Sequence, residues 1–350
     1  MAVSPETLRL LAGLRVAMQR PVDAATERTV RAWATAWNEL ADQWRIAIEE
    51  LVALSKDGQW PTRTQVARAT KIRRAIEVTR EALEALADEL PLTITQHLPS
   101  VTQEAVAWER ALLASQLPAT DAGARIIAGF GRVDPVALDT IVSRTTEQVT
   151  SLSRPLSAQA EQAMRAALIR GVAVGDNPVA AAKVMLDRVE DGFNGGRSRA
   201  LVIARTEILD AHREAGRVAN MRDADVLSGW QWVCRLDRRS CPACWAMHGR
   251  VYSVATPGPW DHQQGRCARL PVARPWSELG LDVDEPASLL PDAQDVFDGL
   301  PREDQVAIMG AKRLGLIDAG RVGIGDLAQR RDTPGWRPSF VPRPVSDLAA

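Results

Sequence analysis

Residues 30–54 read VRAWATAWNELADQWRIAIEELVAL, and the apolar positions in this stretch recur alternately three and four residues apart. This heptad spacing places one stripe of side chains along a single face of a helix over several turns. The tryptophans of the stripe are therefore expected to be core residues rather than groups that stack on a ligand. The stripe consists of Val30, Trp33, Trp37, Leu40, Trp44, Ala47, Leu51 and Leu54.

A second long helix is predicted after a break at residues 58–61, GQWP. Thr62 and Gln65 have the Thr-x-x-Gln spacing of a capping box, which marks a helix start. Because the connection is short, an antiparallel helical hairpin is the simplest arrangement. A third helix is predicted from Ser100. The near-heptad apolar positions of the second helix are Ile72, Ile76, Leu83, Leu86 and Leu90.

The middle of the chain predicts a second helical block after a looser stretch at 118–135. One helix starts at Ser157 and ends near Arg170, and Asp176-Asn177-Pro178 begins the next, with proline near the first helical position. The glycines between 192 and 196 predict a break. Residues 200–221, ALVIARTEILDAHREAGRVANM, then have the periodicity of a further helix.

The pattern changes after Asp223. Residues 229–237, GWQWVCRLD, and 249–254, GRVYSV, predict two strands, whereas prolines and glycines crowd residues 257–275. This region is expected to be a small, loop-rich α+β unit with little apolar core of its own. Short helices are predicted over 301–320 and 323–331, before an irregular, proline-rich end.

These patterns together predict a mainly α protein. A long N-terminal helical hairpin or bundle precedes a helical segment and a small α+β Cys/His unit that resembles a zinc knuckle, and a short helical tail follows. The expected domains are a helical arm over 1–120, a helical lead-in over 121–222, the Cys/His unit over 223–290 and the tail over 291–350.

The composition is typical of a soluble globular protein, with 25% charged and 46% hydrophobic residues and a net charge of -1. No apolar run approaches the roughly 20 residues of a membrane span, and the N-terminus lacks the pattern of a secretory signal. We therefore expect a protein made in the cytosol, where cysteines are reduced. Residues 197–274 hold 13 basic and 7 acidic residues. This basic excess is compatible with an arginine-rich folded region and with a surface that binds an acidic protein or nucleic acid.

The cysteines and histidines cluster within residues 241–267, CPACWAMHGRVYSVATPGPWDHQQGRC. Cys241 and Cys244 form a Cys-x-x-Cys turn that can present two thiolates to one Zn²⁺, and His262 and Cys267 supply two further donors. A closed Cys₃His set leaves no position for substrate, so the predicted zinc is structural. A redox pair lacks its βαβ context here, and a disulfide requires an oxidising compartment.

Two other residues are alternative candidates for ligands of this site. Cys234 lies in a predicted strand, where a buried thiol that behaves as an apolar side chain is expected, although it can substitute as a ligand. His248 ranks below His262 because it lies at a turn into the next strand. The Pro-Cys-x-x-Cys part of the zinc-deaminase signature is absent, because Pro242 lies between the two cysteines and not before them. We also find no His-Glu-x-x-His, P-loop or Gly-x-Ser-x-Gly motif, so no motif indicates catalysis.

The order of several motifs resembles the head morphogenesis domain of the Mu F-like minor head proteins of tailed phages. These motifs are IARTE at 203–207, Asp237, CPAC at 241–244, Gly249, His262 and RC at 266–267. The resemblance extends over about 153–326. The family commonly has His-Pro-x-Cys-Arg-Cys where this chain has HQQGRC, so Gly265 replaces a cysteine and Cys267 is the predicted fourth ligand.

The resemblance implies a non-catalytic minor head protein that acts in capsid assembly. Its expected partners are the portal protein and the major capsid and scaffold proteins, with contact to packaged DNA and no membrane partner. Its expected places are the virion, in the head interior or portal region, and the host cytoplasm during assembly. The alternative is a zinc-dependent nucleic-acid-binding module or a nuclease of the His-Asn-His type, for which Asp261-His262 is a faint echo.

Arg205 and Glu207 of the IARTE motif have a structural and a functional interpretation. Positions two apart do not share a helix face, so the two side chains are expected to bond different partners. We predict structural pinning of the helix to the Cys/His loops, with Arg205 bonding carbonyl groups or Asp237. A contact with DNA or the portal is the functional alternative.

Overall fold

The computed structural model describes residues 2–55, 61–173, 178–334 and 336–349. The chain divides into two compact units. The helical unit consists of Val22–His97 and Arg144–Glu207, and the sheet unit consists of Met1–Pro21, Leu98–Ser143 and Ile208–Ala350. The predicted domain boundaries after residues 120, 222 and 290 stay predictions. The predicted mainly α fold with a small antiparallel sheet and a Cys/His cluster is confirmed.

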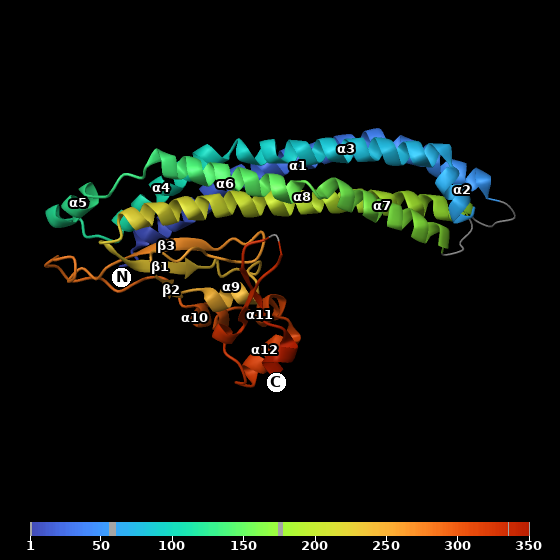
Figure 1. Cartoon of the computed structure of the whole chain (residues 1–350). Helices are drawn as coiled ribbons and strands as arrows, with labels where there is room; N and C mark the ends of the chain where they lie inside the picture. Colours follow the sequence, from blue (N-terminus) through green and yellow to red (C-terminus); the bar gives the residue numbers. More distant parts are fainter. Residues whose placement is uncertain (1, 56–60, 174–177, 335, 350) are drawn as a thin grey trace. The chain divides into compact units, whose positions relative to one another are not determined.

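The helical unit is built from long helices, of which α3 and α7 run side by side (Figure 1). Three helices begin or end in the sheet unit, namely α1, α6 and α8. The helices of this unit are α1 (Pro5–Leu54), α2 (Arg63–Arg68), α3 (Thr70–Thr95), α6 (Pro135–Ser153), α7 (Leu156–Ala173) and α8 (Pro178–Arg222).

The heptad stripe of α1 forms the core of the helical unit, as predicted. Its end residues Val30 and Leu54 are exposed, and the six between them are buried. The indole N–H of Trp44 donates to Thr79 Oγ1 at 2.9 Å, and that of Trp33 donates to the Phe193 carbonyl at 3.2 Å. Large apolar surfaces with satisfied polar atoms explain why tryptophans occupy these core positions.

The predicted capping box before α2 is present. The backbone N–H of Thr62 donates to Gln65 Oε1 at 2.8 Å, and the backbone N–H of Gln65 donates to Thr62 Oγ1 at 3.3 Å. The two side chains thereby satisfy amide groups that the first helical turn leaves unpaired. The predicted break at residues 58–61 lies, except for Pro61, outside the described residues.

The predicted break at the glycines of residues 192–196 is wrong, because α8 runs through them without interruption. A Cβ on Gly192 would lie 2.9 Å from the Met164 backbone nitrogen, and a Cβ on Gly196 would lie 3.2 Å from the Trp33 ring. These glycines therefore permit close packing against neighbouring elements. The predicted helix start at Asp176-Asn177 lies outside the described residues.

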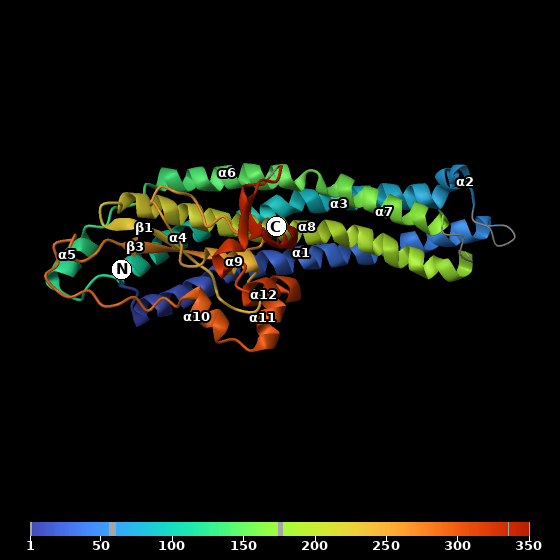
Figure 2. The same ribbon diagram turned by 90° about the horizontal axis from the view of Figure 1, so that it is seen from below.

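The sheet unit contains an antiparallel three-stranded sheet in the order β2-β1-β3, with Trp230 of β1 opposite Tyr252 and Pro271. Figure 2 shows the same sheet from below, near α4 and α9. The elements of this unit are α4 (Leu98–Ala114), α5 (Asp121–Ala128), β1 (Leu227–Val233), α9 (Pro242–Met247), β2 (Val251–Tyr252), β3 (Ala268–Ala273), α10 (Ala293–Asp298), α11 (Arg302–Met309), α12 (Ala311–Asp318), a 3₁₀ turn (Ile324–Asp326), β4 (Ala328–Arg331), β5 (Ser339–Pro342) and α13 (Val345–Ala349).

Two predictions for the Cys/His unit are wrong. Residues 268–273 form strand β3 rather than a loop, and all six are buried, so the strand lacks the polar–apolar alternation that marks a half-buried strand. Pro271 is compatible with this strand because β3 lies at the sheet edge. The unit also has its own core, which includes the buried indoles of Trp230 and Trp232.

Three loop or helix predictions are corrected as well. The stretch predicted as loose contains α5, whose first turn is capped by the Thr120 side chain accepting from the Gly123 N–H. Residues predicted as helix at 323–331 form a 3₁₀ turn and β4, which pairs with β5. The proline-rich end holds β5 and the short helix α13. None of the described helices is both long and apolar enough to cross a membrane.

The close packing at Gly192 predicts opposite effects for alanine substitutions at Gly192 and at Gly195, which lie one turn apart on α8. Gly192→Ala is expected to lower the free energy of unfolding by about 1–3 kcal/mol, because its Cβ meets backbone atoms of α7 that cannot move aside. Gly195→Ala meets nothing within 4 Å and is expected to raise it by about 0.5–1 kcal/mol through helix propensity. Denaturant unfolding measures both, and equal effects would contradict the packing role.

Candidate metal centre

The Cys-x-x-Cys turn joins β1 to the short helix α9. Asp237 shapes it, because its carboxylate accepts from the Arg239 N–H at 3.1 Å and from Ser240 Oγ at 2.8 Å. Cys241 is the N-cap of α9 and Pro242 occupies the first helical turn. The sulfurs of Cys241 and Cys244 lie 3.5 Å apart. This separation excludes a disulfide and is close to the roughly 3.8 Å expected for two thiolates on one tetrahedral zinc ion.

His262 completes a group of three donors. One ligand atom from each of Cys241, Cys244 and His262 lies within 4.8 Å of the other two. The Nδ1 atom of His262 is 2.8 Å from the Gln263 carbonyl oxygen. A carbonyl only accepts, so Nδ1 carries the proton and the lone pair on Nε2 is available to a metal.

Two more thiols lie next to this group. Cys267, the predicted fourth ligand, is buried at the start of β3 and lies within hydrogen-bonding reach of Cys244. Cys234 follows the last residue of β1 and reaches both Cys244 and Cys267. Five donors, four of them sulfur, are therefore gathered around Cys244, and the role of Cys267 as a ligand stays a prediction.

Hydrogen bonds within this cluster shift the charge states of its members. Hydrogen bonds from Cys244 and then His262 lower the pKa of Cys241 to about 5, and the bond to Cys241 raises the pKa of His262 to about 9. Bonding to Cys234 and Cys241 raises the pKa of Cys244. The lowered pKa of Cys241 favours a thiolate, and the raised pKa of His262 means that its Nε2 atom would have to lose a proton to bind a metal ion.

His248 is engaged elsewhere, and its lower ranking as a ligand stays a prediction. Its Nδ1 accepts from the Cys234 backbone N–H at 3.0 Å, and its Nε2 lies 3.0 Å from the Pro291 carbonyl oxygen. Both ring nitrogens are thus occupied. The ring ties the end of β1 to the segment before α10.

A buried ion pair holds the loop that carries His262 and Cys267. Arg213 of α8 pairs in bidentate fashion with Asp261, at 2.9 Å for both contacts, and the two side chains are 5% and 0% exposed. Arg213 also donates to the Cys267 carbonyl at 2.8 Å, and Asp261 accepts from the Cys267 N–H at 3.0 Å. Burial opposes the charge on Arg213, but Asp261 and Asp210 outweigh it and raise the guanidinium pKa.

The same carboxylate explains the glycine at position 265. A Cβ on Gly265 would lie 2.0 Å from Asp261 Oδ2, which is far inside contact distance. The loop therefore has no room for any side chain at this position.

The C-terminal tail reaches the site from the other side. Arg337 donates to the Asp261 carbonyl at 2.7 Å and pairs with both Asp210 and Asp261. Helix α9 contributes side chains both to the cysteine cluster and to a core formed with the tail. Cys244 and Met247 face the cysteine cluster, whereas Trp245 lies in a core formed with tail residues such as Phe297 and Leu327.

The residues predicted to pin the helix lie in different surroundings. Arg205 and Glu207 lie on α8 in the helical unit, half-buried and buried respectively. Asp237 lies in the sheet unit and pairs with Arg266 through contacts of 2.9 and 2.7 Å. The pinning role of Arg205 and Glu207 stays a prediction.

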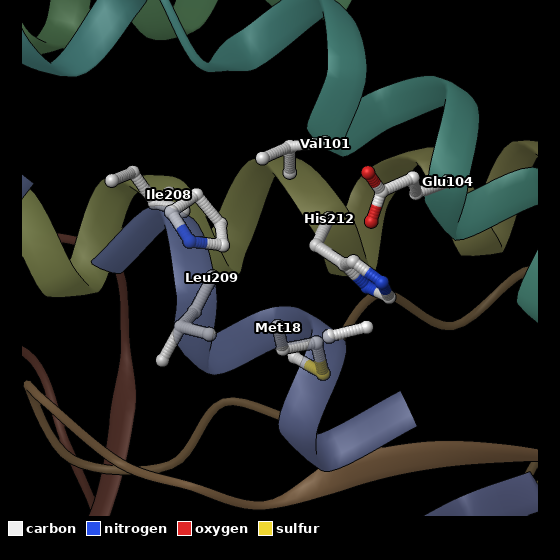
Figure 3. A pocket seen from close by; sticks show the side chains of 8 residues that line it. Met18, Val101, Glu104, Ile208, Leu209 and His212 are labelled. Carbon is white, nitrogen blue, oxygen red and sulfur yellow. The ribbon is translucent and has the colours of Figure 1, made fainter. Parts of the chain in front are cut away.

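A separate pocket in the sheet unit lies between α1, α4 and α8. Figure 3 shows the His212 ring between Glu104 of α4 and Met18 of α1, with Val101 and Leu209 on the apolar walls. Burial and the neighbouring Arg213 lower the pKa of His212 to about 3, so the ring is neutral at ordinary pH. A neutral imidazole in a small apolar pocket gives no arrangement of catalytic groups.

The donor set therefore suits a structural transition-metal ion. Thiolates and imidazole are the ligands that zinc prefers, and the site lies in a folded core rather than at the pocket. Within the described parts of the chain, Cys241, Cys244 and His262 are the group that meets the distance criterion for a metal. Zinc itself, and the His-Asn-His alternative, stay predictions.

The fold and the site thus define a mainly helical protein whose small sheet carries a buried Cys/His centre. Residues 162–269 match the family model described as Phage Mu protein F like protein. This confirms the Mu F-like resemblance, and the matched region covers just under a third of the chain and includes the whole cysteine cluster. The match supports a role in phage head morphogenesis. No curated protein and no solved structure matches the chain.

Sequence reasoning missed the residues that hold the site. Arg213 lies on α8, Asp261 precedes His262, and Arg337 lies far downstream in the proline-rich end. The sequence suggests a faint similarity of Asp261-His262 to a nuclease motif. In the structure, the Asp261 carboxylate pairs with Arg213 and Arg337. Spacing along the chain carries no signal for a pair that forms across 48 residues.

The buried ion pair predicts a large effect for Asp261→Asn. Removing the charge leaves Asp210 as the carboxylate shared by Arg213 and Arg337, so one positive charge in this buried cluster is no longer balanced and the free energy of unfolding is expected to fall by about 3–5 kcal/mol. The control is Asp318→Asn, which makes the same change in an exposed pair with Arg302 and is expected to have no measurable effect. Thermal unfolding of both variants tests this, and a small loss for Asp261→Asn would contradict the role of the pair.

Proposed function

We propose that this protein is a minor head protein that acts in phage capsid assembly without catalysing a reaction. The observation that carries the proposal is the Mu F-like match over residues 162–269, which contains the whole Cys/His centre. The centre is held by buried ion pairs and lacks an open position for substrate in its proposed four-coordinate form. These features favour a rigid structural module over an active site.

We further propose that the centre binds one structural zinc ion. Cys241, Cys244 and His262 supply three donors, and one of the buried thiols Cys267 and Cys234 supplies the fourth. When bound, the ion would link the end of β1, helix α9 and the loop before β3. In such small units, metal binding contributes directly to folding.

The proposed partners are the portal protein and the major capsid and scaffold proteins. The helical unit supports this role, because its long helices expose many charged side chains in short-range pairs such as Arg45 with Asp42 and Glu49. A rigid helical arm of this kind presents an extended docking surface. Contact with packaged DNA is proposed for the arginine-rich stretch 197–274.

The capsid role predicts that the protein is a component of phage particles. In the phage that encodes this chain, we expect antibody detection in purified procapsids and in virions, together with the portal protein. A knockout is expected to yield fewer infectious particles, and supply of the wild-type gene in trans should restore them. Absence of the protein from both particle types, with normal particles in the knockout, would overturn the proposed function.

Zinc removal predicts a localised loss of structure in the sheet unit. A strong chelator is expected to increase hydrogen exchange in α9 and at the end of β1 by at least about tenfold, because α9 carries Cys244 and the cysteine cluster packs directly after β1. Helix α3 of the helical unit is the internal control and should keep its protection. Exchange measured by mass spectrometry tests this, and unchanged protection of α9 after complete metal removal would argue against a structural ion.

A further inference from the structure

The C-terminal tail contributes a hairpin to the shield around the buried thiols of the Cys/His centre. The cysteines other than Cys241 are only 2–4% exposed. Strands β4 and β5 form the hairpin, and Ala328 and Phe340 from these strands pack against the cluster that contains the buried thiols. The Phe340 ring also meets the Trp232 indole of β1 edge to face, with 5.8 Å between the ring centroids. The hairpin therefore lies directly on the cluster.

The hairpin is fastened to the loop that carries the histidine of the centre. The backbone N–H of Phe340 donates to the Trp260 carbonyl at 2.7 Å. Arg337, just before β5, donates to the Asp261 carbonyl at 2.7 Å, and its guanidinium also pairs with the carboxylates of Asp261 and Asp210. These contacts hold the hairpin at the two residues that precede the histidine donor.

The hairpin is also the part of this shield that is best able to open while the central sheet stays folded. Arg330 and Arg331 of β4 are exposed and β5 is mostly half-buried, whereas β3 is buried throughout and β1 is buried at all positions but one. A two-stranded hairpin is marginally stable in water by itself, and segments with few buried contacts open at a lower free energy than the core. Opening of the hairpin alone therefore exposes the thiols more often than unfolding of the whole unit does.

We propose that β4, β5 and Arg337 form a strap that closes over the Cys/His centre and controls the access of thiol reagents, chelators and metal ions to it. Arg337 is the positioning residue of this strap, because its guanidinium joins the strap to both the histidine loop and helix α8. The strap lies beyond residues 162–269, which match the Mu F-like family model. Its closure rests on side-chain and backbone contacts and does not require a bound ion.

Hydrogen exchange of the wild-type, full-length protein tests whether the strap opens by itself. After correction for intrinsic exchange rates, we expect the backbone amides of β4 and β5 to exchange at least about tenfold faster than those of β1. The Phe340 amide is the most informative, because it donates to the Trp260 carbonyl that fastens the strap. Equal exchange in the strap and in β1 would overturn the proposal, because the two would then open together.

Thiol labelling of the native protein tests whether the strap controls access. Phe340→Ala removes the ring that covers the cluster, and Arg337→Lys keeps the charge but loses the branched guanidinium that contacts both Asp210 and Asp261. Both variants are expected to react with N-ethylmaleimide at the buried thiols at least about tenfold faster than wild type, as peptide mass spectrometry measures.

The matched control is Ile141→Ala, which truncates a buried side chain of the same unit in a separate cluster with α4 and α8. It lowers the stability of the unit but leaves the strap closed, so its labelling rate is expected to stay within about twofold of wild type. Labelling that rises equally in Ile141→Ala, or that does not rise in the two strap variants, would overturn the proposal. Neither measurement requires a bound ion or phage particles, so failure of the strap leaves the proposed zinc site and head role to their own tests.

Discussion

The buried pair between Arg213 and Asp261 is the interaction on which the Cys/His centre depends. It joins helix α8 to the loop before β3, and both partners also bond the backbone of Cys267 or Gly265. Taking two charges out of water is costly, and such a pair persists when hydrogen bonds satisfy both groups, as they do here. The pair thus fixes one geometry of the loop instead of merely adding stability, and His262 is placed by that geometry.

The long helices could be predicted from the sequence because their signal is local. The stripe from Trp33 to Leu51 repeats every three or four residues, and that period belongs to a helix whatever it packs against. The glycines at 192 and 196 misled the prediction for the opposite reason. These glycines allow α8 to pack closely against α7 and Trp33, which lie far away in the sequence. A prediction from the local sequence alone therefore mistakes tight packing for a helix break.

The candidate site could be predicted in part, because some of its residues form a local sequence pattern. The Cys-x-x-Cys turn and His262 follow a spacing that suits one metal ion, and the structure brings these three donors together. Strand β3 could not be predicted, because both of its faces are buried and its sequence does not alternate between polar and apolar residues. The contact of Arg337 with Asp261 could not be predicted either, because 76 residues separate them and no local sequence pattern marks such a pair.

The position of α9 between two cores links the metal centre to the tail. Cys244 and Met247 face the sulfur cluster, whereas Trp245 is fully buried among tail residues and packs edge-on against Phe297. A six-residue helix is too short to be stable alone, so its conformation depends on both contacts. Disruption of the cysteine cluster and loss of the tail core should therefore disturb the same element, and residues beyond the Mu F-like region contribute to the site within it.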